Sequence, residues 1–272
     1  MSLFVASLNS GSNGNCYYLG NEREAILVDA GISCRETETR MSRLGLSMRK
    51  VKAIFISHEH SDHIRGITVL AKKYRLPVYI TSLTLQHGGL ALEDGLTAEF
   101  IAGEPIRIGG LLVTAFSKLH DAAHPHSFTV ACGDIKVGVF TDIGAVCENL
   151  ILHFRQCHAA FLETNYDEEL LENGRYPLHL KRRIRGGWGH LSNKQALTLF
   201  MHHKPAYMTH LFLSHLSKDN NDPALVRNLF NTHANGTEII VASRYAETPV
   251  YHINGEVSKT NAVIENLQFS LF

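Results

Sequence analysis

Short runs of aliphatic and β-branched residues recur along the chain and predict strands of about five residues each. These runs cover Ala25–Asp29, Ala53–Ser57, Leu111–Phe116 and Lys136–Phe140. They fall in both halves of the chain, and segments with helical spacing lie between them. This alternation predicts an α/β fold in which helices cover the sheets.

The clearest helix signal follows the strand that ends at Ser57. Ser61 and Asp62 have the short polar side chains of an N-cap. Apolar residues then recur every three or four positions, at Ile64, Ile67, Leu70, Ala71 and Tyr74. We therefore expect one helix to begin directly after this strand.

Two further helices are predicted in the second half of the chain. Ser192 and Gln195 have the spacing of a capping box. Asp222-Pro223 combines a cap residue with proline at the first helical position. The apolar face expected of this last helix comprises Leu225, Leu229 and Phe230.

The composition limits how the chain can bind a polyanion. Its 26 Lys and Arg residues balance its 26 Asp and Glu residues, so the formal net charge is zero. This balance excludes a highly charged disordered chain and provides no global field that attracts nucleic acid or an anionic membrane. Any contact with a polyanion must therefore be local. Because no linker or repeat divides the sequence, we expect residues 1–272 to form one domain.

The sequence also indicates where the protein resides. No stretch of about 18 consecutive apolar residues occurs, and residues 1–15 lack the basic start and apolar run of a signal peptide. The five cysteines are odd in number and contain no C-x-x-C pair, so we expect reduced thiols. These features predict a cytoplasmic protein without membrane contact. They indicate no oligomeric state.

Histidine is abundant, with 17 residues, and its densest cluster is the sequence His58-Glu59-His60-Ser61-Asp62-His63. Two residues apart in an extended chain, His58 and His60 project to the same side and can bind one metal ion. Asp62 and His63 can reach a second ion at the helix start. Three imidazoles and a carboxylate so close together would be left unsatisfied without a cation. The H-x-H-x-D-H pattern therefore predicts a metal centre.

This pattern resembles the metallo-β-lactamase superfamily, and the remaining motifs of that superfamily occur in order along nearly the whole chain. The resemblance implies a four-layer αββα sandwich with Asp29 supporting the metal loop. It also implies that His120 completes the first metal site, Asp142 bridges two ions and His215 closes the second site. The sequence leaves alternatives for two of these positions. His124 and His126 compete with His120, and His210 competes with His215.

The segments around Glu163 and His190 resemble those of the tRNA 3′-processing endonucleases and related phosphodiesterases, in which such a pair supplies and orients a proton donor. Lactamases carry an export signal, which is not seen here. The β-CASP nucleases insert a large domain between the bridging Asp and the last His, whereas only 73 residues separate Asp142 from His215. The long arm with which tRNA-processing enzymes grip their substrate has no obvious counterpart.

Three strings resemble the YycJ-like (VicX/WalJ) branch: residues 10–16, residues 176–184 and residues 215–221. This resemblance implies a metal-dependent DNA 5′→3′ exonuclease, so we expect DNA rather than RNA as substrate. One departure is Tyr166, where that branch has His, and no role is carried over to it. The residues expected to contact substrate are Asn13, Asn15, Asn165, Lys181 and Arg182. Lys181 and Arg182 belong to a basic cluster that could equally be a solvated helix face.

The residues also suit phosphodiester hydrolysis without that resemblance. Two divalent ions bridged by Asp142 would activate a bridging hydroxide for in-line attack on phosphorus. Asp62 would accept the proton of the water, and His190, oriented by Glu163, would protonate the leaving oxygen. Zn²⁺ is the first expectation for both ions, and Mn²⁺ or Fe²⁺ also suits His and Asp ligands. The alternative functions are a small-molecule or cyclic-nucleotide phosphodiesterase and a non-catalytic regulatory protein stabilised by metal.

Overall fold

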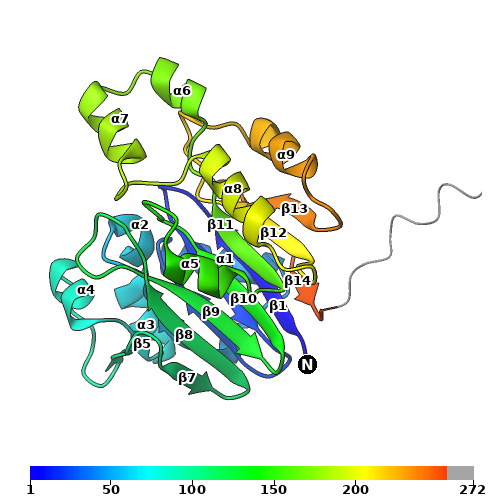
Figure 1. The fold of residues 1–272 in the computed structure, drawn as a ribbon. Helices are drawn as coiled ribbons and strands as arrows, with labels where there is room; N and C mark the ends of the chain where they lie inside the picture. Colours follow the sequence, from blue (N-terminus) through cyan, green and yellow to red (C-terminus); the bar gives the residue numbers. More distant parts are fainter. Residues whose placement is uncertain (256–272) are drawn as a thin grey trace, which may run out of the picture.

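The computed structural model describes residues 1–255, which form two sheets of seven strands each (Figure 1). The first sheet has the strand order β14-β1-β2-β3-β4-β5-β6. Its strands are β1 (Leu3–Asn9), β2 (Cys16–Gly20), β3 (Ala25–Val28), β4 (Val51–Phe55), β5 (Val78–Tyr79), β6 (Thr97–Ala98) and β14 (Tyr251–Ile253). Strand β14 therefore comes from the end of the described chain and pairs with β1, with Leu3 opposite Ile253.

The second sheet has the order β13-β12-β11-β10-β9-β8-β7 and is built from the second half of the chain. Its strands are β7 (Pro105–Ile108), β8 (Leu111–Ser117), β9 (His126–Cys132), β10 (Ile135–Phe140), β11 (Ala159–Glu163), β12 (His210–Ser214) and β13 (Glu238–Val241). All four strands predicted from sequence are present, with ends that differ by no more than two residues.

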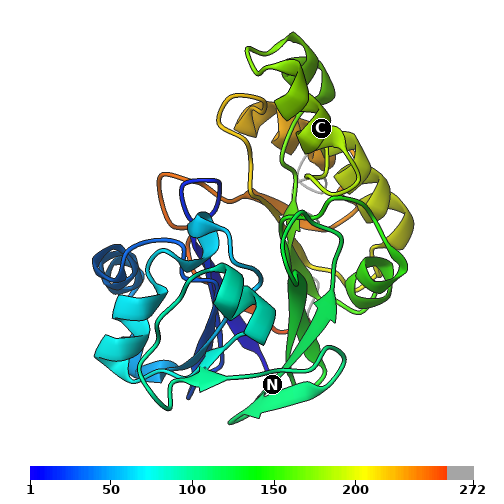
Figure 2. The same ribbon diagram turned by 90° about the vertical axis from the view of Figure 1, so that its left-hand side faces the viewer.

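Helices cover the outer face of each sheet (Figure 2). On the first sheet these are α1 (Cys34–Arg43), α2 (Ser61–Ile64), α3 (Ile67–Tyr74) and α4 (Ser82–His87), with the 3₁₀ turn η1 (Met48–Lys50) before β4. On the second sheet they are α5 (Glu148–Phe154), α8 (Asn193–His203) and α9 (Pro223–Asn231). Helices α6 (Glu168–Asn173) and α7 (Leu178–Arg185) instead project beyond the sheets (Figure 1).

Three apolar cores correspond to the three interfaces between four layers. The central core joins the two sheets and contains Phe55 and Tyr17 from one sheet and Phe161 from the other. A second core lies between the first sheet and its helices, and a third lies between the second sheet and α5, α8 and α9. The predicted αββα architecture is therefore confirmed.

The parallel parts of the two sheets determine where the polar motifs meet. Strand β3 pairs in parallel with β4, and β10, β11 and β12 are parallel neighbours in the second sheet. The carboxyl ends of parallel strands lie at the same edge of a sheet. The segments at the carboxyl ends of these five strands carry Asp29, the His58–His63 turn, Asp142, Glu163 and His215.

The helix predicted after Ser57 differs from the structure in two ways. Ser61 and Asp62 are its first helical residues and the N-cap is His60, which makes no side-chain capping bond. The helix is also divided at Gly66, whose N–H donates to Ala30 O at 2.8 Å. A Cβ at Gly66 would lie 1.9 Å from the carbonyl oxygen of Ile32. Close contact with the β3–α1 loop therefore interrupts the helix here.

Both capping signals in the second half are confirmed. Ser192 and Gln195 form the full capping box of α8, and the Asp222 carboxylate caps α9. The predicted apolar face of α9 was wrong in part, because Val226 and Phe230 are buried whereas Leu225 is 38% exposed.

Three broader predictions have different outcomes. All five cysteines are free. No helix within residues 1–255 has the length and apolarity needed to cross a bilayer. The single domain predicted for residues 1–272 includes residues 256–272, which lie outside the described part of the chain.

Candidate metal centre

The His58–His63 turn places two imidazoles beside each other directly after β4. His58 is fully buried, and its Nε2 lies 3.1 Å from His60 Nδ1. One ligand atom from each of His58, His60 and His120 fits within a group whose members lie within 4.8 Å of one another. This group matches the first metal site expected from sequence.

His120 has the environment of a prepared metal ligand. Its Nδ1–H donates to the carbonyl oxygen of Gly189 at 2.9 Å, which leaves Nε2 as the acceptor nitrogen. Nε2 is buried and finds no hydrogen-bond partner among residues 1–255. Burial lowers the pKa of His120 to about 3, so the imidazole is neutral and its lone pair is available. The competing His126 instead donates to His124 O and packs edge-on against Phe100.

A second group of ligand atoms adjoins the first. His63 Nε2 lies 3.1 Å from Asp142 Oδ2 and 3.6 Å from Asp62 Oδ2. His215 Nε2 lies 3.5 Å from both Asp62 Oδ2 and Asp142 Oδ1. Asp142 Oδ1 is also 3.8 Å from His120 Nε2, so the Asp142 carboxylate lies between the two groups. This position fits the bridging role expected for it.

Three residues of the cluster adopt a left-handed backbone conformation just after a strand. Asp29, Asp142 and His215 have φ values of 62°, 55° and 57°. This region is costly for residues other than glycine and is retained where the surrounding structure imposes it, often at functional sites. In all three, the backbone turns at the end of β3, β10 or β12, and the side chain lies in the cluster or, for Asp29, directly behind it.

Buried hydrogen bonds behind the cluster fix the orientation of the imidazoles. His63 Nδ1–H donates to Asp29 Oδ2 at 2.7 Å, and Asp29 also accepts from the backbone N–H and hydroxyl of Ser57. His215 Nδ1–H donates to Glu163 Oε1 at 3.0 Å. Both rings therefore present Nε2 to the centre, as metal-binding histidines do when a carboxylate holds the other nitrogen.

The charges in the cluster favour a cation. Burial lowers the pKa of His63, but the carboxylates of Asp142, Asp29 and Asp62 outweigh it and raise that pKa well above its usual value. Burial likewise opposes protonation of His215, whereas Asp142, Asp62 and Glu163 raise its pKa to about 10. The buried carboxylates thus require positive charge at the centre, which a divalent ion provides in place of imidazole protons.

A polar atom without a partner gives a separate indication of a metal ion. His120 Nε2 and Asp142 Oδ2 are buried, and neither makes a contact with hydrogen-bond geometry within residues 1–255, although Asp142 Oδ2 lies 3.1 Å from His63 Nε2. Buried polar atoms in proteins are normally satisfied. An imidazole nitrogen and a carboxylate oxygen are ligands for Zn²⁺, Mn²⁺ and Fe²⁺. The residues present therefore fit divalent metal ions.

The structure brings Glu163 and His190 together, as the sequence predicted. His190 Nδ1–H donates to Glu163 Oε1 at 2.7 Å, and Nδ1 lies 3.9 Å from Asp142 Oδ1. Burial would raise the pKa of Glu163, but His190 and His215 lower it to about 2, so Glu163 is ionised. The side chain of His190 is 20% exposed, so it can reach a bound molecule.

Two of the predicted substrate contacts, Asn15 and Asn165, lie behind the cluster, and their contact with a substrate stays a prediction. Asn15 is completely buried and donates to Asp62 Oδ2 at 3.1 Å. Asn165 is 5% exposed and donates to the carbonyl oxygen of His215 at 2.8 Å. Both amides therefore position cluster residues. The third amide, Asn13, is exposed and donates to the carbonyl oxygen of Arg244.

The basic residues predicted to contact substrate lie on the projecting helix α7. Arg182 is exposed and forms no ion pair with a carboxylate in the described chain, and Lys181 donates to the carbonyl oxygen of Glu172. Arg183 is bound to Asp121, the neighbour of His120, at 2.5 Å. Their contact with a substrate stays a prediction.

His210 and His215, the two alternatives for the second metal site, lie at opposite ends of β12. His215 follows the last residue of β12 and lies in the cluster, whereas His210 begins that strand at its opposite end. His210 Nε2 lies 3.6 Å from Glu238 instead. The geometry therefore places His215, and not His210, at the second group of ligand atoms.

The sequence interpretation missed two residues near the centre. Lys118 is buried, and its Nζ donates to the carbonyl oxygen of Thr141, the residue before Asp142. Trp188 is 60% exposed and lies two residues before His190. A Cβ at Gly144 would lie 2.5 Å from the Cα of Trp188, so the backbone there is tightly packed. The sequence did offer one signal for Trp188, because it is the single tryptophan of the chain and lies two residues before His190.

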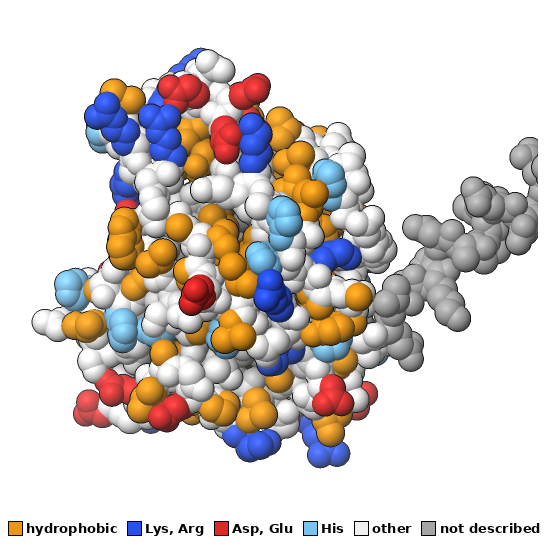
Figure 3. All heavy atoms as spheres, viewed as in Figure 1, with side chains coloured by type: hydrophobic (Ala, Val, Ile, Leu, Met, Phe, Trp, Pro, Cys, Tyr) orange, Lys and Arg blue, Asp and Glu red, His pale blue; other side chains and the backbone are white. Residues whose placement is uncertain are grey.

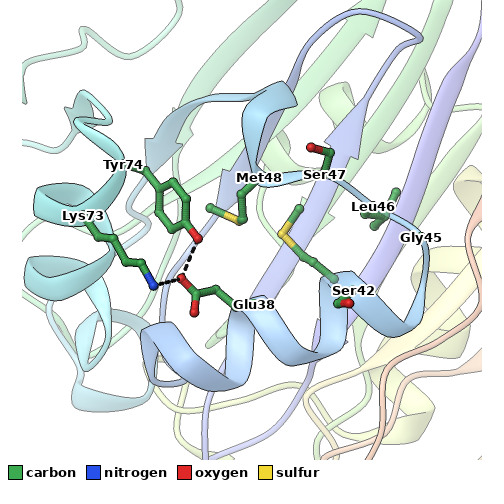
Figure 4. Close-up of a pocket in the computed structure, with 9 residues that line it drawn as sticks. Glu38, Ser42, Gly45, Leu46, Ser47, Met48, Lys73 and Tyr74 are labelled. Carbon is green, nitrogen blue, oxygen red and sulfur yellow. Dashed lines mark hydrogen bonds and ion pairs between the residues drawn. The ribbon is translucent and has the colours of Figure 1, made fainter.

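A separate depression carries none of the residues of the cluster. It has a volume of about 570 Å³ and is bordered by α1, the loop after it and α3 (Figure 4). Glu38 there accepts from Tyr74 and pairs with Lys73, both at 2.5 Å. These contacts neutralise its charged groups.

Comparisons with known proteins agree with this geometry. Residues 24–215 match the model of the beta-lactamase superfamily domain. The chain is 36% identical over 232 residues to exodeoxyribonuclease YycJ of Bacillus anthracis, an alignment that covers 84% of this chain and 87% of that protein. It is 32% identical over 223 residues to exodeoxyribonuclease WalJ of Streptococcus pneumoniae, which covers 79% of this chain and 81% of that protein.

The fold has a close counterpart among solved structures. The metallo-β-lactamase fold protein YhfI from Bacillus subtilis superposes with a TM-score of 0.71 and 17% identity, over 93% of this chain and 100% of that one. At this identity the likeness concerns the fold alone.

Proposed function

The chain belongs to the β-lactamase superfamily, and from this membership we propose that it is a DNA exonuclease that acts from the 5′ end with two divalent metal ions. It is a metal-dependent hydrolase of phosphoric ester bonds. The proposal concerns its substrate, its polarity and the number of ions. The names of YycJ and WalJ, which are similar over most of their length, support DNA as the substrate.

The observation that carries the proposal is the His190–Glu163 pair beside the cluster. Cleavage of a phosphodiester in DNA releases a sugar oxygen that needs a proton. His190 lies partly exposed next to Asp142, and its Nδ1 is held by Glu163 at 2.7 Å. We assign His190 as the proton donor and Glu163 as the residue that orients it.

The ligand atoms divide between two ions. His58, His60, His120 and Asp142 would hold the first, and Asp62, His63, His215 and Asp142 the second. When bound, the ions would polarise the phosphate and make a water more acidic, with Zn²⁺ the first candidate and Mn²⁺ or Fe²⁺ alternatives. The Asp62 side chain is 16% exposed and is held by Asn15, so it can accept the proton of the attacking water.

The surface beside the centre suits a nucleic acid strand. Side chains of Lys and Arg gather over α7 (Figure 3), although the chain as a whole is neutral. The sequence of α7 contains Lys181, Arg182, Arg183 and Arg185. Cations of this kind bind phosphates of the backbone. Trp188, two residues before His190 in the sequence, is 60% exposed, and aromatic rings stack with the bases of single strands. Together these features favour a polynucleotide over a small phosphodiester.

A cleavage assay with the metal-loaded protein tests the proposal. The substrates are 5′-phosphorylated single- and double-stranded DNA, RNA of the same sequence and a chromogenic phosphodiester. We expect mononucleotides released from the 5′ end of DNA, and loss of this activity in Asp62→Ala. Hydrolysis of only the chromogenic phosphodiester would contradict the proposal and favour a small-molecule phosphodiesterase. Metal analysis of the active fractions gives the number of ions per chain.

A further inference from the structure

A cavity of about 370 Å³ adjoins the proposed metal centre on the side of His215. Its lining includes Ser10, whose Oγ accepts the backbone N–H of His215 at 2.8 Å. It also includes Leu216 and Ser217, the two residues that follow His215. The volume falls in the range that holds small ligands. A group bound in this cavity would therefore lie next to the proposed centre.

The cavity carries an excess of positive charge. Lys218, Arg227 and Arg244 line it, and none of them forms an ion pair with a carboxylate in the described chain. The single carboxylate of the lining is Asp222, whose Oδ1 accepts the N–H groups of Ala224 and Leu225 at the start of α9. Three cations against one carboxylate, in a chain of zero net charge, form a local site for an anion.

One hydroxyl group in the same lining can donate to an anion. Ser243 Oγ accepts the N–H of Tyr245, which leaves the hydroxyl hydrogen of Ser243 available to donate. The other lining hydroxyl, Ser217, already hydrogen-bonds with the phenol of Tyr176. Cations combined with a hydroxyl donor are groups that bind phosphate. Tyr245 also lines the cavity and is 72% exposed, so its ring can stack with a base.

We propose that this cavity, the end pocket, binds the 5′-terminal phosphate of a DNA strand and selects phosphorylated ends. The proposal rests on the proposed exonuclease function. A terminal phosphate carries about −1.5 to −2 charges near neutral pH, whereas a phosphate inside the strand carries one. The excess of cations matches the terminal group better. A cavity also admits the end of a strand more readily than its middle.

Cleavage of two substrates by the wild type and by one variant tests the end pocket. The substrates are oligonucleotides of one sequence with a 5′-phosphate or a 5′-hydroxyl. For the wild type we expect kcat/KM to be about 10-fold to 100-fold higher with the phosphate, the worth of hydrogen bonds to a charged group. Arg227→Ala should lose most of this preference and leave cleavage of the 5′-hydroxyl strand unchanged. Only the phosphorylated strand has a group for Arg227 to contact, so the effects of removing the phosphate and removing the arginine should not add.

A matched control and an independent readout complete the test. Arg49→Ala removes an exposed arginine in η1, before β4, and should keep the wild-type preference. Calorimetry with the full chain should detect thymidine 5′-monophosphate before and after chelation of the metals, and Arg227→Ala and Lys218→Ala should weaken this binding. Equal binding of thymidine 3′-monophosphate would overturn selection of the strand end.

The outcomes separate this proposal from the function on which it rests. If DNA is cleaved from both kinds of end at equal rates, the end pocket is refuted and the exonuclease function stands. If no DNA is cleaved while thymidine 5′-monophosphate still binds through Arg227, the exonuclease function fails and the phosphate site remains. Equal losses on both substrates in Arg227→Ala would assign the arginine to general strand binding and refute selection of ends.

Discussion

Replacing Glu163 by glutamine tests the buried network that connects the proton donor to the metal centre. Glu163 is completely buried, and its two oxygens accept four hydrogen bonds. Oε1 accepts from the rings of His190 and His215, and Oε2 accepts from the backbone N–H groups of Ile143 and Leu191. A carboxylate accepts all four, whereas the amide introduced by Glu163→Gln would place an NH₂ donor against two donors in either orientation.

The cost follows from the two donors left without an acceptor. Each unsatisfied buried donor costs about 1–3 kcal/mol, so Glu163→Gln should lower the free energy of unfolding by about 2–6 kcal/mol. For a chain of this size we expect the melting temperature to fall by at least about 4 °C. Because His190 loses its charged partner, kcat on DNA should fall by about 10²-fold to 10⁴-fold, the usual contribution of general acid catalysis.

Thermal unfolding gives the change in melting temperature, and single-turnover cleavage gives the change in rate, both measured at the same metal loading. Glu22→Gln is the matched control, because Glu22 is exposed and should change neither quantity. A Glu163→Gln protein that melts with the wild type and cleaves DNA at the wild-type rate would refute the network. A loss of stability with an unchanged rate would restrict Glu163 to a structural role.

Four further predictions concern the centre and its surroundings. His190→Ala should slow cleavage of DNA by about 10²-fold or more but leave a chromogenic diester with a good leaving group nearly unaffected, as rate measurements on both substrates will tell. Chelation should lower the melting temperature, and titration should restore it at two ions per chain, because bound ions stabilise the folded state; a calorimetric scan without any shift would contradict a metal centre. Single-stranded DNA should quench the fluorescence of Trp188, whereas an abasic strand of equal length should not. Gly31→Ala should abolish cleavage while the ligands remain, because its Cβ would lie 1.6 Å from the carbonyl oxygen of Asp62 and displace that segment; full activity of this variant would show that the loop can adjust.

The αββα layers and the metal centre could be predicted where neighbouring residues in the sequence carry the pattern. The H-x-H-x-D-H turn concentrates its donors within six residues, and the ends of strands mark Asp29 and Asp142. The resemblance confirmed by the comparisons supplied the order of the distant motifs. His215 and His210 both border β12, and only the direction of that strand in the sheet places one at the cluster and the other at the opposite end.

Other features depended on long-range packing that a local pattern does not contain. Asn15 and Asn165 were expected to contact substrate, and the sequence did not show that each amide donates to a cluster residue from behind. Gly66 interrupts a continuous apolar stripe because of a contact with Ile32, a residue from another loop. Lys118 was missed because its burial depends on the carbonyl oxygen of Thr141, which a segment distant in the sequence supplies.

The pairing of β14 with β1 has a consequence for synthesis of the protein. Strand β1 is translated long before β14, and its outer edge stays open until Tyr251–Ile253 is available. An open edge can pair with strands of other chains and lead to aggregation. The first half of the chain therefore cannot complete its own sheet before the second half has been translated. Premature release near residue 250 would leave a nascent protein with all of its proposed metal ligands and an unprotected edge.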